Sequence, residues 1–193
     1  MHVFLGITGA SGAPYAARLI QELAAAGADL GVCISRPGYD VLATELYRDP
    51  SLPRDEIAAR LLDGTDATVY AENDWKAPYA SGSAKVDAYV ICPCSMSSVG
   101  TIAAGSMANL IHRAAAVALK EQRKLVLVPR ETPLSLIHLR ALTALREAGA
   151  TILFAAPGFY NGWESVDDLI EFVVERCLDQ IGLERAEARR WGQ

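Results

Sequence analysis

The chain has 193 residues, of which 51% are hydrophobic and 21% are charged, and its formal net charge is −5. This length suits one domain with one sizeable core, and the negative charge gives no general attraction to nucleic acid or anionic lipid. No apolar run approaches the ~18 residues of a membrane span, and the N-terminus lacks the regions of a signal peptide. We therefore expect a cytoplasmic protein with reduced cysteines and no nucleic-acid or membrane partner.

Apolar runs of strand length alternate with segments of helical period along the chain. In chain order, they predict a strand at 2–7, a helix at 14–26, a strand at 30–34, a helix at 38–47, a strand at 88–92, a helix at 110–122, a strand at 125–128, a helix at 134–148, a strand at 151–154 and a helix at 165–181. Strands that are apolar on both faces favour a parallel sheet. We predict a three-layer, doubly wound α/β fold of Rossmann or flavodoxin type, with ligands at the carboxyl ends of its strands.

A glycine-rich turn, TGASG at 8–12, joins the first strand to a helix that opens at Pro14. Backbone N–H groups and the Ser11 hydroxyl then converge on a helix N-terminus, which favours an anion. Neither G-x-G-x-x-G nor Gly-Lys-Ser/Thr is present, so the turn is not a dinucleotide fingerprint or a P-loop. A plain tight turn is the alternative interpretation.

The next two strands also end in polar residues. Ser35 and Arg36 follow the second strand, where a dinucleotide-binding fold places an acidic residue, and this favours a phosphate monoester. The strand at 88–92 breaks at Pro93 into a hydroxyl-rich segment that contains Ser95 and Ser98. A C-x-C pair can bind metal, but no second Cys or His pair stands at ligand spacing, so we predict buried thiols and no metal site.

Cations and one acid follow further along the chain. Arg113 and Lys120 lie seven residues apart, on one face of a predicted helix, and Arg130 with Glu131 comes directly after a strand. Three positive groups and one carboxyl suit phosphoryl binding with proton delivery, while a solvated helix face is the alternative for the first pair. Taken alone, Tyr160 is interpreted as an aromatic core residue and Arg176 as a surface charge.

Several segments resemble the UbiX-type flavin prenyltransferases when taken in order: GITGASGAPYAARL, the serine after the second strand, ASGS, CPCS, NLIHRAAAVALKE, RKLVLVPRETPL, HL and GFY. The match spans nearly the whole chain, and RAA-x-V-x-LKE followed by R-x-LVL-x-x-RETPL-x-x-x-HL is its most specific part. The resemblance implies FMN and dimethylallyl phosphate bound between adjacent subunits of a dodecamer. It also implies transfer of the dimethylallyl group to N5 and C6 of reduced FMN without a metal, which makes prenylated FMN for UbiD-type decarboxylases.

The resemblance assigns roles to individual residues. The residues that it implies hold FMN are Gly9, Ala10, Ser11, Ser35 and Arg130, with Ser95 and Ser98 approaching the flavin. Those that it implies grip the dimethylallyl phosphate are Arg113, Lys120, Tyr160 and Arg176, and Glu131 would protonate the departing phosphate.

Two alternatives are an FMN-dependent cysteine-type decarboxylase of the same superfamily and a non-catalytic FMN-binding protein. The first would carry an active-site His in the early helical region and a PASANT-like segment, and neither is visible in this sequence. The second would not need Lys120, Glu131 or Arg176, and all three are present.

The chain departs from the family at Ser97-Ser98, Ala108, Ala116 and 161–163. We expect residues 1–183 to form a single FMN-binding domain, and the tail at 184–193 to dock on it or on a neighbouring subunit.

Overall fold

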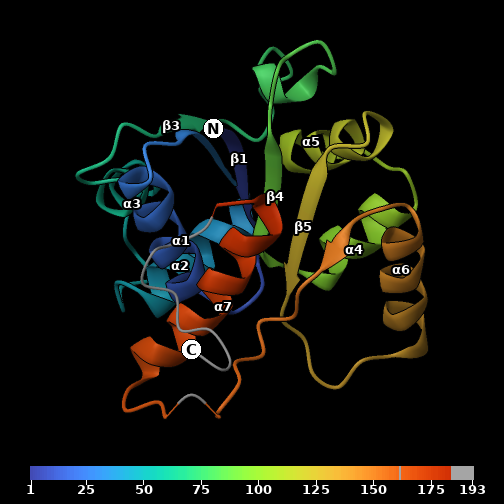
Figure 1. Ribbon diagram of the computed structural model, residues 1–193. Coiled ribbons are helices and arrows are strands. Elements are labelled where there is room, and N and C mark those ends of the chain that lie inside the picture. Colours follow the sequence, from blue (N-terminus) through green and yellow to red (C-terminus); the bar gives the residue numbers. More distant parts are fainter. Residues whose placement is uncertain (161, 184–193) are drawn as a thin grey trace.

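One parallel sheet organises the computed structural model, which describes residues 1–160 and 162–183. Its strands are β1 (His2–Ile7), β2 (Asp29–Ile34), β3 (Thr68–Tyr70), β4 (Ala88–Cys94), β5 (Lys124–Pro129) and β6 (Thr151–Ile152), in the order β3-β2-β1-β4-β5-β6 (Figure 1). The order runs outward from β1 in both directions. The switch point therefore lies between β1 and β4, where folds of this type bind ligands.

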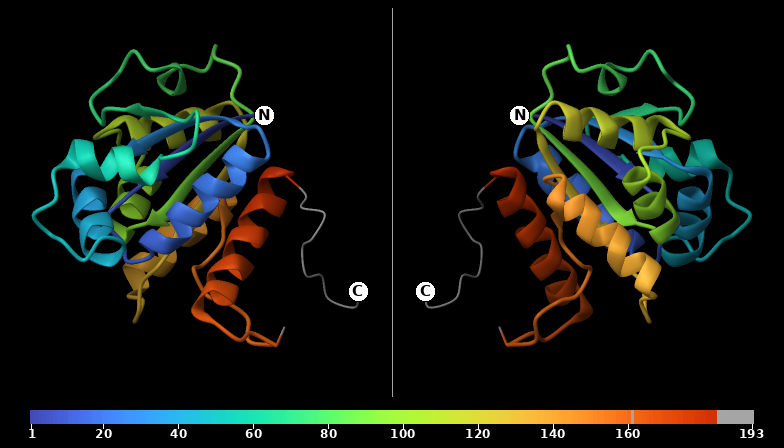
Figure 2. Two further views of the ribbon diagram at one scale, coloured as in Figure 1. Left: turned by 90° about the vertical axis from the view of Figure 1, so that its left-hand side faces the viewer. Right: turned by 90° about the vertical axis from the view of Figure 1, so that its right-hand side faces the viewer.

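Helices cover both faces of the sheet. The core on one face includes residues from α1 (Ala13–Ala25), α2 (Arg36–Glu45), α3 (Arg54–Leu61) and α7 (Val166–Ile181). The core on the other face includes residues from α4 (Met96–Ala103), α5 (Leu110–Lys120), α6 (Leu136–Glu147) and the short 3-10 helix η1 (Pro78–Ala80). Figure 2 shows α7 running alongside α1 on the first face. The predicted three-layer, doubly wound fold is confirmed.

Strand alternation explains why two separate cores form. Val3, Leu5 and Ile7 of β1 pack in the first core, while Phe4 between them packs in the second. Successive side chains of a strand point to opposite faces. A strand buried on both faces must therefore be apolar throughout, and this is the pattern from which β1 was predicted.

The sequence prediction missed the short elements at the β3 edge of the sheet. β3 has three residues, and two of them are exposed, so it carries no apolar run. The predicted strand at 151–154 ends at Ile152, although the Leu153 and Ala155 N–H groups still donate to β5 carbonyls, at 2.9 and 3.0 Å.

Among the described residues, no helix is both long and apolar enough to cross a bilayer. The predicted tail at 184–193 lies outside the described residues.

Candidate functional site

The loops that follow β1, β2, β4 and β5 meet at the carboxyl edge of the sheet. The Thr8 hydroxyl donates to the Pro93 carbonyl at 2.9 Å and accepts from the Ser95 N–H at 2.7 Å, which ties the β1 loop to the β4 loop. Arg130 Nε donates to the Ser11 carbonyl at 3.4 Å, which ties the β5 loop to the β1 loop. We call the residues that the resemblance assigned to FMN the flavin group, and all of them lie on these loops or at the helix starts beside them: Gly9, Ala10, Ser11, Ser35, Ser95, Ser98 and Arg130.

Two serines of the flavin group are also helix N-caps. Ser35 Oγ accepts from the Gly38 N–H at 3.1 Å at the start of α2, and Ser95 Oγ accepts from the Ser98 N–H at 3.2 Å at the start of α4. A hydroxyl that accepts a capping bond still has one proton to donate. The capping role of Ser35 is therefore compatible with binding an acceptor at the same edge, whereas the Ser95 hydroxyl donates its proton to Ser98 Oγ at 3.2 Å.

Gly9 has a packing reason to be glycine. A Cβ atom on Gly9 would lie 2.5 Å from the Pro37 Cβ, so a larger residue would push the β1 loop away from the start of α2. Gly9 thus lets the two loops of the flavin group approach each other closely.

The start of α1 differs from the predicted anion cradle. The Gly12 and Ala13 N–H groups both donate to Oε2 of Glu45, at 2.9 Å each, so a carboxylate from α2 already occupies the first donors of this helix. An anion at this edge would therefore need other donors, such as residues 9–11, the serine hydroxyls and Arg130. The sequence carries no signal for this contact, because Glu45 stands 33 residues after Gly12.

A buried histidine extends the hydrogen bonds of the flavin group. Nε2 of His112, on α5, lies 3.1 Å from Ser98 Oγ, which accepts from the Ser95 hydroxyl at 3.2 Å. Burial lowers the pKa of His112, against a smaller opposing effect of the Glu72 carboxylate. A neutral imidazole therefore lies directly behind two of the predicted FMN serines.

The C-x-C thiols lie inside the two cores. Cys92 and Cys94 are buried, and burial raises the pKa of Cys94 to about 12 and that of Cys92 well above its usual range. Such thiols stay protonated, as expected of buried strand cysteines. In the described part of the chain, no three His, Cys, Asp or Glu side chains gather in a way that could hold a metal ion.

Arg113 and Lys120 form a second group, the α5 group, and they lie on one face of the helix as predicted. Arg113 Nε donates to the Ala80 carbonyl at 2.9 Å. Lys120 pairs with Glu121, and its Nζ would lie 2.6 Å from a Cβ added at Gly82. Both cations therefore border the segment at 80–82, which is part of the ASGS motif.

Within one chain, Lys120 of the α5 group lies far from Glu131. Lys120 ends the helix that precedes β5, whereas Glu131 follows β5 at the carboxyl edge, where its Oε1 accepts from the Thr132 N–H at 3.0 Å. The six residues of β5 rise about 20 Å. One subunit thus places the predicted proton donor and the predicted lysine at opposite edges of the sheet.

Tyr160 and Arg176 form a third group beside α7, the α7 group. The Tyr160 ring is 60% exposed and packs edge-on against Phe172, with 5.9 Å between the ring centroids. Arg176 pairs with Asp179 on the same helix at 2.9 Å. Tyr160 is therefore not a core residue, and the predicted prenyl-phosphate residues divide between the α5 group and the α7 group.

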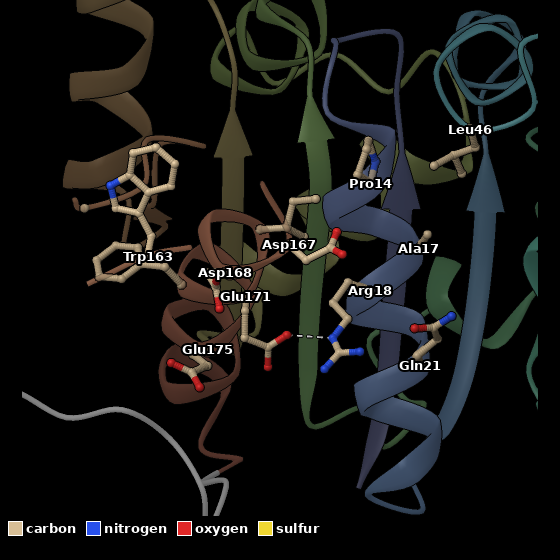
Figure 3. Close-up of a pocket in the computed structure, with 13 residues that line it drawn as sticks. Pro14, Ala17, Arg18, Gln21, Leu46, Trp163, Asp167, Asp168, Glu171 and Glu175 are labelled. Atoms are coloured by element: carbon tan, nitrogen blue, oxygen red, sulfur yellow. Dashed lines mark hydrogen bonds and ion pairs between the residues drawn. The ribbon is translucent and has the colours of Figure 1, made fainter. Parts of the chain in front are cut away.

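A groove of about 580 Å³ lies between α1 and α7 (Figure 3). Among the described residues, the charged groups that line it are the Arg18 guanidinium and the carboxylates of Asp167, Asp168, Glu171 and Glu175. Arg18 Nε contacts Glu171 at 2.6 Å. An excess of carboxylates repels a phosphate ester, so the described lining of this groove does not favour an anion.

The comparisons with known proteins show the family of this chain. The flavoprotein family model matches residues 1–178. A flavin prenyltransferase UbiX from Pseudomonas aeruginosa is 46% identical, over 99% of this chain and 94% of that protein. The chain belongs to the UbiX family of flavoproteins.

Solved structures of UbiX proteins share the whole fold. A dodecameric FMN-dependent UbiX-like decarboxylase from Escherichia coli O157:H7 has a TM-score of 0.88 and 40% identity, and the match covers 100% of both chains. AnUbiX (PadA1), in complex with FMN and dimethylallyl pyrophosphate, has a TM-score of 0.89 and 34% identity, over 100% of this chain and 97% of that one.

The flavin group offers hydrogen-bond donors that suit a flavin nucleotide. Four serine hydroxyls and the Arg130 guanidinium lie on the loops and helix starts of one sheet edge, and Gly9 keeps two of these loops close together. Hydroxyls and a guanidinium suit the phosphate and the carbonyl oxygens of a flavin nucleotide. These residues fit FMN.

Three residues near the flavin group were not predicted to have a role: Thr8, Glu45 and His112. Thr8 stands inside the glycine-rich motif, so its position after a strand was a signal that could have been used. His112 stands in no sequence pattern that indicates a role beside the flavin group. Its contact with Ser98, 14 residues earlier in the chain, depends on how α4 and α5 pack.

Proposed function

We propose that this chain is a flavin prenyltransferase, which transfers the dimethylallyl group of dimethylallyl phosphate to N5 and C6 of reduced FMN. The observation that carries the proposal is the 46% identity, over almost the whole chain, to a UbiX flavin prenyltransferase. The solved complex of AnUbiX with FMN and dimethylallyl pyrophosphate supports the same pair of ligands.

The flavin group would hold FMN. Arg130 and the hydroxyls of Ser11, Ser35 and Ser98 would donate to its oxygen atoms. Ser95, whose hydroxyl donates to Ser98 Oγ, would lie beside the flavin, and Gly9 and Ala10 would let the β1 loop approach it. When bound, reduced FMN supplies the nucleophilic ring atoms that accept the dimethylallyl group.

The α5 group and the α7 group would stabilise the leaving phosphate. Cleavage of an allylic C–O bond leaves negative charge on the phosphate, and fixed cations and donors stabilise that charge most strongly where water is excluded. Arg113, Lys120 and Arg176 would supply the cations and Tyr160 a hydroxyl donor. Glu131 would deliver a proton to the departing phosphate.

We propose that each site contains residues of two subunits. Lys120 and Glu131 lie at opposite ends of β5, so both can reach one phosphate only if a second copy supplies one of them. The dodecameric E. coli relative is a precedent for such an assembly. We propose that this chain also forms a dodecamer and that its product is delivered to a UbiD-type decarboxylase.

We also propose that residues 1–183 act as a single FMN-binding domain and that the tail at 184–193 docks on this domain or on a neighbouring subunit. A cytoplasmic location is part of the same proposal. The free cysteines Cys33, Cys92, Cys94 and Cys177 are all buried, and unpaired thiols suit a reducing compartment.

The direct test is the mass of the flavin after incubation of the protein with reduced FMN and dimethylallyl phosphate. We expect a flavin that is heavier by one prenyl unit. Unmodified FMN, with a known UbiX enzyme active in parallel, would count against the proposal. Loss of CO2 from a cysteine-containing substrate would favour the cysteine-type decarboxylase instead.

Substitution of the phosphate-binding residues separates binding from turnover. We expect Lys120→Ala and Glu131→Ala each to keep FMN affinity within about twofold and to lower the rate of prenyl transfer by about 100-fold or more, because each acts on the leaving phosphate. FMN fluorescence titration and single-turnover assays measure the two quantities. Loss of FMN binding would show that these residues belong to the flavin pocket.

A further inference from the structure

The surroundings of His112 indicate a role that the family assignment does not supply. The side chain is 7% exposed, and its ring nitrogens differ: Nε2 lies 3.1 Å from Ser98 Oγ, whereas Nδ1 is buried with no hydrogen-bond partner among the described residues. Since Ser98 belongs to the flavin group, any role of this ring toward FMN rests on the proposed function.

The partner-free Nδ1 indicates which nitrogen carries the proton. A neutral imidazole has one N–H donor and one acceptor nitrogen. If the proton were on Nδ1, a buried N–H would have no acceptor, and orphaned buried N–H groups are rare. With the proton on Nε2, the N–H donates to Ser98 Oγ and only a lone pair lacks a partner. The neutral ring should therefore carry its proton on Nε2.

This tautomer determines what the Ser98 hydroxyl can do. A serine oxygen has two lone pairs and one proton. The Ser95 hydroxyl donates to Ser98 Oγ at 3.2 Å, and His112 Nε2–H would fill the second lone pair at 3.1 Å. The Ser98 proton must then point away from both neighbours.

We propose that His112 is a positioning residue, which fills the second lone pair of Ser98 Oγ and so holds the Ser98 hydroxyl as a donor to an acceptor atom of FMN. His112 itself need not touch the flavin. Its backbone is fixed because Asn109 Oδ1 accepts the His112 N–H at 3.0 Å, which places the residue in the first turn of α5.

The tautomer can be measured without FMN. In the full chain labelled with ¹⁵N-histidine, nitrogen chemical shifts distinguish the two neutral tautomers, and the signals of His112 are those missing from His112→Gln. We expect a protonated Nε2 and an unprotonated Nδ1 at pH 7.5. A protonated Nδ1, or a doubly protonated ring, would overturn the proposal.

The second measurement is FMN affinity in a double-mutant cycle. We expect His112→Leu to weaken FMN binding by about three- to tenfold, and His112→Gln, which retains an N–H near Nε2, to bind within about twofold of the wild type. The double variant His112→Leu/Ser98→Ala should bind as Ser98→Ala does, because the histidine acts only through that hydroxyl. His138→Leu, on α6, is the matched control, with unchanged affinity.

The outcomes separate this proposal from the proposed function. Suppose that the wild type binds FMN. If His112→Leu and Ser98→Ala then weaken FMN binding by factors that multiply in the double variant, or if His112→Gln binds FMN as weakly as His112→Leu, the proposed role of His112 is wrong. Neither result affects the prenyltransferase proposal. A wild-type chain that does not bind FMN would overturn both. Thermal unfolding of each variant without FMN confirms that only folded proteins are compared.

Discussion

Glu45 shows how one side chain can change what a helix start binds. Helix N-termini attract anions because their first N–H groups have no partner within the helix. At α1 a carboxylate of the same chain accepts from Gly12 and Ala13, which satisfies both donors. The glycine-rich turn still allows the β1 loop to lie close to the start of α2. The start of α1 beside it, however, is already capped by Glu45.

We predict that Glu45→Ala lowers the free energy of unfolding by about 1–2 kcal/mol, because two N–H groups lose a charged acceptor. Glu45→Gln should lose less, since its amide oxygen can still accept. Urea unfolding of the FMN-free protein measures both changes. The control is Glu147→Ala, at an exposed position of α6, which should stay within about 0.5 kcal/mol of the wild type. Equal effects of Glu45→Ala and Glu147→Ala would contradict the capping role.

At the scale of elements, η1 and the segment after it are held on the sheet by the Tyr79 ring and two arginines. A Cβ on Gly31 of β2 would lie 2.1 Å from the Tyr79 hydroxyl oxygen, which itself contacts His2 Nε2 at 2.8 Å. Arg123 and Arg113 then donate to the Gly82 and Ala80 carbonyls. Since the α5 group borders this segment, the packing of Tyr79 supports the position of both cations.

We predict that Gly31→Ala destabilises the fold by about 1–3 kcal/mol, because the added methyl would displace the buried Tyr79 ring. Gly100→Ala on α4 is the matched control. A Cβ there meets nothing within 4 Å, and Ala is about 0.5–1 kcal/mol better than Gly inside a helix. Denaturant unfolding of the two variants should therefore give changes of opposite sign. A neutral Gly31→Ala would show that Tyr79 can move without cost.

At the scale of the whole molecule, the length of β5 dictates how an active site can be assembled. The strand separates the end of α5 from Glu131, and no rearrangement of side chains spans a parallel strand of this length. A site with both residues therefore needs a symmetric contact between copies, in which one surface supplies the lysine and another the glutamate.

Mixing inactive subunits tests this arrangement. We predict that Lys120→Ala and Glu131→Ala subunits, each inactive alone, regain activity when unfolded and refolded together, with about a quarter of the sites carrying both native residues at equal proportions. The amount of prenylated flavin formed in a single turnover measures the fraction of these sites. If both residues came from the same subunit, mixing would restore no activity.

The sequence by itself determined the fold class, the longer strands and helices, and the loops that carry the flavin group. These follow from local patterns, because the hydrophobic period distinguishes a two-sided buried strand from a helix, and parallel strands end at a shared edge. The serines after β2 and β4 could be placed at that edge without any knowledge of distant contacts.

Only the tertiary structure decided which distant residues meet. Glu45 accepts hydrogen bonds at the start of α1, and His112 contacts Ser98. Lys120 and Glu131 lie at opposite ends of β5. Each outcome depends on how whole helices pack against the sheet, and side-chain type and spacing in the chain do not encode that geometry.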